Sequence, residues 1–315
     1  MAGGPVHRSL SAEIRDRRSP VRRFLHERFG AGLRGVQRRY RESVPQLAVP
    51  QLAVPPRGSP AGTVAVAARW LLRFLLHPAP DLDLVLGGVR CCRAAGIELG
   101  EAVTGVVQRL GMTLPIAPGP VQHFTGPIPG SPAEPAMLAR ACWCFGLLTE
   151  AYRGGTGVRR ARSPLRQLRG RRASSQDLLD LAPAAALAEL ADLRAVFTSR
   201  LLPALAARPG RWALGPVFAG SRLLAADADL AASGLLLQLK VTVHASLAAD
   251  DLFQLIAYPL LDFTDGYRIR DLGYFSARTG HLATWQLKRL LTELAGQPVD
   301  LAAARAGFRN LLEAG

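Results

Sequence analysis

The second half of the chain shows short apolar or alternating runs, a pattern typical of β-strands. We predict five strands, at 211–218, 221–232, 235–243, 270–277 and 281–287. Ser233-Gly234 supplies a hairpin turn between the second and third strands. A helix at 249–263 separates the third strand from the fourth, and two helices follow the last strand. This order predicts a mixed α/β (α+β) domain.

The first half has a helical pattern instead. Apolar residues recur at helical spacing in four segments, 64–76, 84–94, 99–110 and 136–152, with a Pro/Gly-rich loop at 113–135. Another helix begins after Ser174 or Ser175 and is interrupted at Pro183. A mostly helical region is therefore expected to precede the sheet.

The N-terminal segment is read as an arm. We expect disorder over residues 1–18, a basic amphipathic helix over 19–41 and an extended Pro-rich linker over 45–60. The apolar stripe of the helix is expected to dock on the body of the protein rather than on a membrane. We therefore divide the chain into an arm (1–60), a helical region (61–175) with a basic loop (153–172), and a sheet domain (176–315).

Positive charge is concentrated in two segments. The net charge is +15, and residues 1–43 carry eleven Arg against four acidic residues, while residues 151–173 carry eight Arg and no acidic residue. Such segments favour a polyanionic partner, nucleic acid first and an anionic membrane second. Arg159, Arg160 and Arg162 are the candidates for phosphate contacts. The alternative is that these arginines are only solvated loops.

Composition also bears on location. The first residues lack an apolar segment, so no signal peptide is expected, and the longest apolar run is too short and too charged to insert stably in a membrane. The four cysteines, at 91, 92, 142 and 144, do not have the C-x-x-C spacing of a zinc site, and we expect free thiols in helices. We predict a protein of the bacterial cytoplasm.

The candidate chemistry lies on two neighbouring strands. On the segment LLLQLKV, Gln238 and Lys240 point away from the face formed by the leucines, and Lys240 is one of only two lysines in the chain. Asp227 and Asp229 share one face of the preceding strand. Because the Ser-Gly turn folds these strands together, the two carboxylates and the amide oxygen predict an Mg²⁺ or Mn²⁺ site formed by Asp227, Asp229 and Gln238.

A helical pair completes the pattern, since Gln254 and Tyr258 lie at positions i and i+4 on one helix face. The sequence resembles the PD-(D/E)XK nuclease superfamily. The resemblance rests on the order of an acidic strand, a Q-x-K strand and a Q-x-x-x-Y helix, and the helix motif is that of the RecB-type branch. The resemblance covers roughly residues 185–290. It implies a restriction-endonuclease-like α-βββ-α-β core, with Asp229, Gln238 and Lys240 as catalytic residues and Gln254 and Tyr258 as supporting or DNA-contacting residues.

Gln238 departs from the family, which usually has Asp or Glu there, although the Mrr-like branch has Q-x-K. Loss of one negative charge weakens metal binding, and Asp227 could restore it. The expected function is a nuclease that hydrolyses DNA phosphodiesters with a metal-activated water. The first alternative is a catalytically inactive nuclease-fold subunit that binds DNA or assembles with other proteins. The second is an unrelated helical interaction protein whose basic helix over 19–41 binds a partner or a membrane surface. A protein partner would bind through the N-terminal helical region. The sequence does not decide between DNA and RNA as the substrate, or between internal and terminal cleavage. It does not decide the oligomeric state either.

Overall fold

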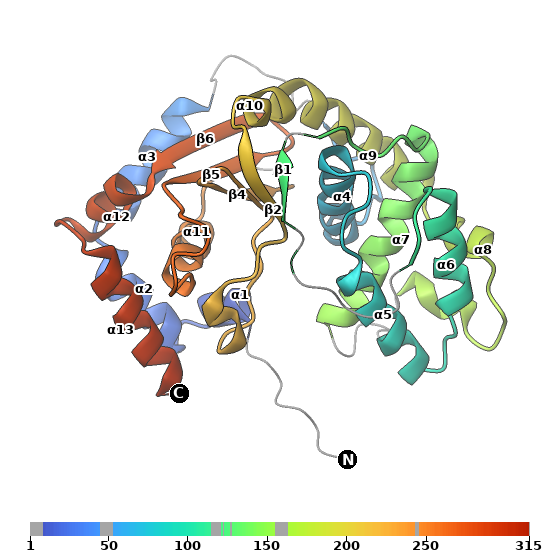
Figure 1. The fold of residues 1–315 in the computed structure, drawn as a ribbon, viewed down its shortest axis with the longest axis horizontal. Coiled ribbons are helices and arrows are strands. Elements are labelled where there is room, and N and C mark those ends of the chain that lie inside the picture. Colours follow the sequence, from blue (N-terminus) through green and yellow to red (C-terminus); the bar gives the residue numbers. More distant parts are fainter. Residues whose placement is uncertain are drawn as a thin grey trace.

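The computed structural model of the chain describes residues 9–44, 53–114, 121, 123–126, 128–154, 163–242 and 246–314. Within these residues the chain forms one mixed sheet with helices on both faces (Figure 1). The predicted α/β (α+β) class is confirmed at this level.

The sheet has six strands whose order in space follows the sequence. They are β1 (His123–Gly126), β2 (Gly210–Leu214), β3 (Leu230–Ala232), β4 (Leu235–Lys240), β5 (Asp271–Ser276) and β6 (His281–Gln286). β4 and β5 run parallel, whereas all other neighbours are antiparallel. The parallel pair requires a crossover, which is provided by α11 (Ala249–Leu261).

One face of the sheet is covered by the helical half of the chain. Leu235, Leu237 and Leu239 of β4 share a single hydrophobic core with these helices. The helices are α4 (Ala61–Leu76), α5 (Asp83–Ala94), α6 (Gly100–Arg109), α7 (Pro135–Arg153), α8 (Ser175–Leu179), α9 (Ala184–Val196) and α10 (Leu202–Ala206). Short turns of 3-10 helix (Pro164–Leu168) and π-helix (Phe197–Leu201) join them. Ser174 caps α8, and Pro183 precedes α9, as predicted.

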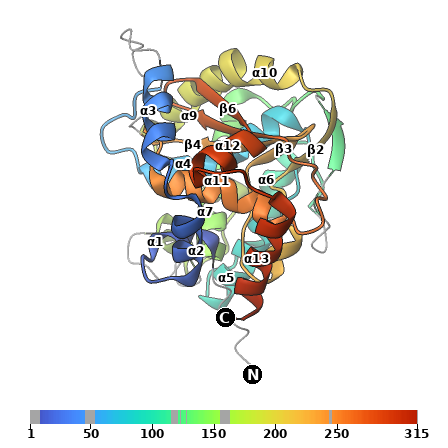
Figure 2. The same cartoon turned by 90° about the vertical axis from the view of Figure 1, so that its left-hand side faces the viewer.

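The opposite face is covered by α11 and by both ends of the chain (Figure 2). Around α11 lie α1 (Leu10–Arg15), α2 (Pro20–Phe29), α3 (Leu33–Ser43), α12 (Leu287–Ala295) and α13 (Leu301–Glu313). The apolar stripe predicted in the basic N-terminal helix is buried here, including Leu25 and Val36. The arm therefore docks on the body of the protein.

Two N-terminal expectations need correction. Residues 10–15, expected to be disordered, form α1, whose first turn is capped by the Ser9 hydroxyl. The single helix expected over 19–41 is two helices, because the chain crosses α12 at Gly32. The Gly32 N–H donates to the Leu294 carbonyl at 2.9 Å, and a Cβ at Gly32 would lie 2.0 Å from the carbonyl oxygen of Glu293.

The strands also differ from the prediction. The strand expected over 211–218 ends at Leu214 in β2. β1 lies within the segment expected to be a loop, and it becomes a strand by pairing with the edge of β2. The strand expected over 221–232 is shortened to β3, because a 3-10 turn (Ala219–Arg222) and two isolated bridges take up the preceding residues. As a result, Asp227 and Asp229 lie just before β3 rather than in it.

Candidate functional site

β4 presents Gln238 and Lys240 to the face of the sheet that carries α11. The leucines at 235, 237 and 239 pack in the core with the helical half, while Leu236 belongs to the core around α11. Gln238 and Lys240 share the side of Leu236, because side chains alternate along a strand. The predicted division of β4 into an apolar and a polar face is confirmed.

The two glutamines and Tyr258 form a row of hydrogen bonds between β4 and α11. Gln238 Nε2 donates to Gln254 Oε1 at 3.0 Å, and Gln254 Nε2 donates to the Tyr258 hydroxyl at 2.7 Å. Gln254 Nε2 also lies 3.3 Å from the hydroxyl of Ser11 in α1. Gln238 is 4% exposed, and its Oε1 has no hydrogen-bond partner among the described residues. The Q-x-K strand and the Q-x-x-x-Y helix thus face each other.

Asp229 lies beside Leu239 near the end of β4, and its carboxylate pairs with an arginine from the helical half. Its Oδ1 accepts from Arg69 Nε at 2.7 Å, and its Oδ2 accepts from the Leu239 N–H at 2.7 Å. Arg69 Nη2 also donates to the Leu239 carbonyl at 3.3 Å. Since β3 begins only at Leu230, these two side chains make the bonds to Leu239 that a longer strand would make. Both oxygens of Asp229 are therefore engaged.

Asp227 is paired in the same way, with Arg153 at the end of α7. Burial raises the pKa of the nearby Tyr258 hydroxyl, and the negative charges of Asp229 and Asp227 raise it further. Tyr258 therefore stays neutral and acts as a hydrogen-bonding group. Arg73, one turn after Arg69 on α4, lies close enough to both aspartates to interact with them electrostatically.

Lys240 is directed toward α11. Its ammonium pairs with Asp251 Oδ1. The other oxygen of Asp251 accepts from the Tyr274 hydroxyl at 3.1 Å and from the Ala248 N–H at 3.2 Å, which caps α11. Asp251 is buried, so Lys240 provides the charge that a buried carboxylate needs. Lys240 thus pairs with Asp251 of α11, whereas Asp229 and Asp227, which were expected to act with it, pair with Arg69 and Arg153.

The expected metal site can be tested on these contacts. Asp227, Asp229 and Asp251 are each paired with a cationic side chain. In the described parts of the chain, no three His, Cys, Asp or Glu side chains gather in a group that could hold a metal ion. The unpartnered Gln238 Oε1 is neutral, and a divalent ion needs several oxygen ligands, mostly anionic. As arranged here, the residues do not fit Mg²⁺ or Mn²⁺.

The partners of the motif residues were not anticipated from the sequence. Arg69 and Arg153 lie in helices of the first half, far along the chain from Asp229. One signal was present: Arg69 and Arg73 interrupt an otherwise apolar helix at a spacing of four residues, so both point to one face. Charged residues in a buried helix usually have charged partners.

The predicted basic loop can be followed only in part. Arg159, Arg160 and Arg162 lie outside the described residues. Arg171 and Arg172 pair with Asp177 and Glu101. Some of the charge in this segment is therefore balanced by acids from neighbouring helices.

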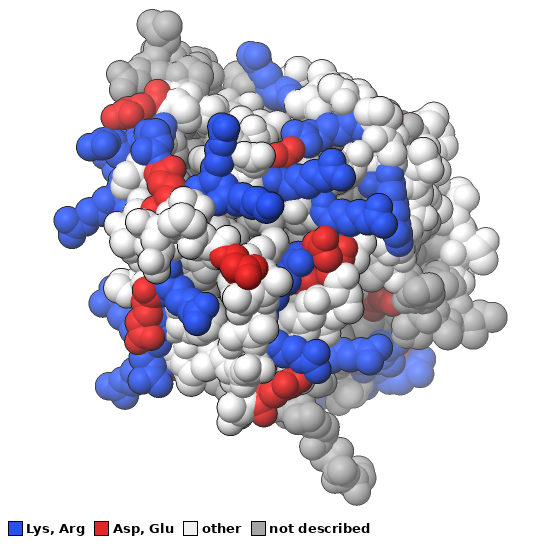
Figure 3. Space-filling view, turned by 60° about the vertical axis from the view of Figure 1, so that its left-hand side comes forward, with Lys and Arg blue, Asp and Glu red and all other residues white. Residues whose placement is uncertain are grey.

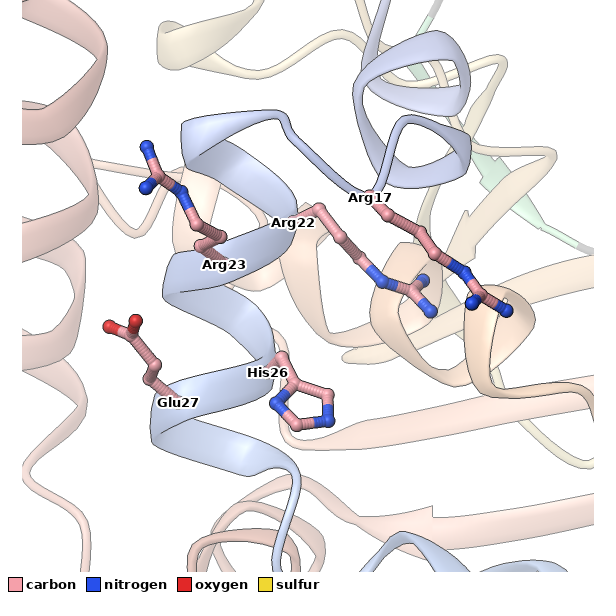
Figure 4. Close-up of a pocket in the computed structure, with 5 residues that line it drawn as sticks. All are labelled: Arg17, Arg22, Arg23, His26 and Glu27. Atoms are coloured by element: carbon pink, nitrogen blue, oxygen red, sulfur yellow. The ribbon is translucent and has the colours of Figure 1, made fainter.

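A shallow depression of about 380 Å³ lies beside α2, lined by Arg17, Arg22, Arg23, His26 and Glu27 (Figure 4). Arg17, Arg22 and His26 point to one side of the helix, while Arg23 and Glu27 point to the other. Arg22 is already paired with Asp250 and lies over the Phe253 ring. The lining groups therefore do not converge on a ligand.

Comparisons with protein-family models, with curated proteins and with solved structures each found no match. In the described parts of the chain, every helix is too short or too polar to cross a membrane.

Proposed function

We propose that this chain is a nucleic-acid-binding protein built on a nuclease-like core, with the charged groups of the catalytic motif held in internal ion pairs. The order of elements supports such a core. Helices α9 and α10 precede three antiparallel strands, β2 to β4, and α11 then crosses over to β5, which runs parallel to β4. This order agrees with the α-βββ-α-β core that the resemblance implies, and it supports the proposal.

The pairing of the motif residues carries the proposal. Asp229 is bound to Arg69, and Lys240 is bound to Asp251. A metal-dependent nuclease needs its carboxylates for the ion and its lysine for the water or the phosphate. Both pairs would have to break before any such step. A binding role requires neither break, and one fold can serve either role.

The charge of the chain supports nucleic acid as the partner. The net charge is +15. Figure 3 shows Lys and Arg side chains spread over the side of the molecule that carries α3, α12 and α13, with fewer Asp and Glu among them. A surface of this kind attracts the phosphate backbone at long range and binds it in a salt-dependent manner.

A metal-dependent DNA nuclease is the second candidate, favoured by one observation. The Oε1 atom of Gln238 is buried without a hydrogen-bond partner in the described chain, beside Gln254 and Tyr258. Buried amide oxygens normally have a partner, and a cation would provide one. Under this candidate, Arg69 would have to leave Asp229 when the substrate binds.

The two candidates differ in what happens to bound DNA. Supercoiled and linear DNA are incubated with the protein and Mg²⁺ or Mn²⁺, beside Asp229→Asn and Lys240→Met, and both binding and strand integrity are followed on gels. We expect binding that weakens with salt, and intact DNA. Cleavage by the unmodified protein that disappears in both variants would contradict the proposal and establish the nuclease. Absence of binding at low salt would overturn both.

A further inference from the structure

We infer that nucleic acid binds this protein at the end of the sheet where β4 and β5 begin. Lys240 lies at the opposite end of β4. The inference rests on the proposed binding function and names its surface. Five cationic side chains gather at this end through the topology of the sheet: Arg211, Arg268, Arg270, Lys288 and Arg289. We call them the basic edge.

Backbone hydrogen bonds hold the segments of the basic edge together. The Ser233 N–H, in the turn between β3 and β4, donates to the Arg211 carbonyl at 2.9 Å. On the other side of that turn, the Arg270 N–H donates to the Gly234 carbonyl at 2.8 Å. The Arg270 carbonyl accepts from the Leu287 N–H at 2.7 Å, where α12 begins. Lys288 and Arg289 follow directly, so all five positions lie along one end of the sheet.

These five cations are not neutralised within the described chain. All five are exposed, and none makes an ion pair with a carboxylate there. The nearby carboxylates are engaged elsewhere, since Asp271 pairs with Arg208 at 3.0 Å, Asp265 pairs with Arg305 at 2.7 Å, and Glu293, one turn beyond Arg289, pairs with Arg39. The basic edge therefore keeps its full positive charge.

The spacing of the basic edge suits a phosphate backbone. From β2, which carries Arg211, to β5 and β6 there are three to four strand intervals. At about 4.8 Å each, they span about 14–19 Å. One strand of a duplex, with its rise of about 3.4 Å, places about four to six phosphates over that length. Guanidinium groups match phosphate oxygens in pairs, so four arginines and a lysine provide a run of backbone contacts.

The chemistry of the basic edge favours nucleic acid over a lipid surface. Binding to a membrane surface usually combines charge with apolar side chains that insert between lipids. The large apolar side chains exposed in the described chain are Val54, Tyr152, Val217 and Leu223, and none lies in the segments of the basic edge.

The location has a consequence for the motif residues. Lys240 ends β4, five residues after Leu235, which places it about 16 Å from the basic edge. A duplex bound along the basic edge would leave the Asp229–Arg69 and Lys240–Asp251 pairs undisturbed. Binding should therefore not depend on Lys240.

The test compares two variants that lose the same charge. The edge variant carries Arg270→Gln, Lys288→Gln and Arg289→Gln. The matched control carries Arg57→Gln, Arg90→Gln and Arg109→Gln, which are also exposed, make no ion pair in the described chain and lie away from the edge. Affinity for a short fluorescent duplex is measured by anisotropy at several salt concentrations.

We expect the edge variant to bind at least tenfold more weakly and to lose about 2.7 units from the slope of log affinity against log salt, since each phosphate contact contributes about 0.9. The control should stay within twofold of the unmodified protein, as should Lys240→Met. Equal weakening of edge and control variants would overturn the inference, as would an unchanged edge variant, while leaving the proposed function in place. If the unmodified protein does not bind the duplex, both the inference about the basic edge and the proposed binding function are overturned.

Vesicles containing anionic lipid form a second arm of the experiment. Preferential binding of the unmodified protein to vesicles over the duplex, lost in the edge variant, would assign the basic edge to a membrane and overturn the inference. We expect the duplex to be preferred.

Discussion

At Leu239, hydrogen bonds that a neighbouring strand would normally make are made by two side chains. Asp229 accepts from the N–H, Arg69 donates to the carbonyl, and the two are bound to each other. The side chains of Arg69 and Asp229 are 31% and 14% exposed, so water compensates only partly when one of them is removed. The pair is therefore expected to stabilise the edge of β4 whether or not the motif is catalytic.

Replacing Asp229 with alanine should lower the free energy of unfolding by about 2 kcal/mol, because a charged hydrogen bond is lost and Arg69 keeps an uncompensated charge. Urea unfolding measures the change. Asp192→Ala, an exposed aspartate, is the control and should be nearly neutral. Equal stability of the two variants would show that the pair contributes nothing.

The raised pKa of the Tyr40 hydroxyl predicts how the stability of the protein changes at alkaline pH. Burial raises the pKa of Tyr40 from 10.0 to about 12. Between these values the unfolded chain loses the proton while the folded protein keeps it, so the stabilisation is complete below pH 10 and is lost as the pH rises toward 12. The loss from this group is about 2–3 kcal/mol. Tyr40→Phe should flatten the decline in urea-unfolding free energy, and an identical decline in both proteins would refute this assignment.

Contacts within the site could be predicted where the residues lie close together in the sequence, and not where they lie far apart. The faces of β4 follow from strand alternation, and the facing of Gln254 and Tyr258 follows from helical spacing, so both could be predicted. Arg69 is 160 residues from Asp229, and no local pattern connects them. Lys240 was correctly placed on the polar face, but its pairing with Asp251 depends on how α11 docks on the sheet.

At the scale of elements, the break between α2 and α3 shows how packing overrides a local pattern. The amphipathic stripe continues from α2 into α3, and it predicted one helix. The structure separates them at Gly32, where the backbone of α12 leaves no room for a side chain. β1 is a second case, since a Pro/Gly-rich segment becomes a strand only because β2 offers it an edge.

Two glycines provide a matched test of this contact. Gly32→Ala should destabilise the protein by about 2 kcal/mol, because its Cβ would collide with α12 and force the backbone to shift. Gly35→Ala lies within α3, where a Cβ would meet nothing closer than 3.7 Å. That variant should gain up to about 1 kcal/mol from helix propensity. Thermal unfolding of both variants checks the prediction, and a similar effect of the two would argue against the close approach at Gly32.

At the scale of the whole molecule, a buried ion pair joins the helical half to the sheet. Arg278, after β5, pairs with Glu189 of α9, and both side chains are 0% exposed. Arg278 also donates to the carbonyls of Val241 at 3.1 Å and Ala53 at 3.0 Å, and Glu189 accepts from the Ser59 hydroxyl. These bonds connect the linker, α9 and the end of β4.

Arg278→Met should lower the free energy of unfolding by about 3–5 kcal/mol, because Glu189 would remain buried without its partner. Arg278→Met combined with Glu189→Leu should recover much of that loss, since both charges are then removed. Chemical unfolding of the single and double variants measures the difference. A double variant as unstable as the single one would indicate that the bonds to the linker, rather than the charges, matter most.

We propose that the motif charges at the end of β4 are satisfied within the protein and that its role is binding rather than cleavage. The most direct test is calorimetric titration of Mn²⁺ into the unmodified protein and into Asp229→Asn. We predict no saturable binding at millimolar Mn²⁺ in either protein. Stoichiometric binding by the unmodified protein that is lost in Asp229→Asn would contradict the claim, because it would mean that Asp229 releases Arg69 in favour of a metal ion.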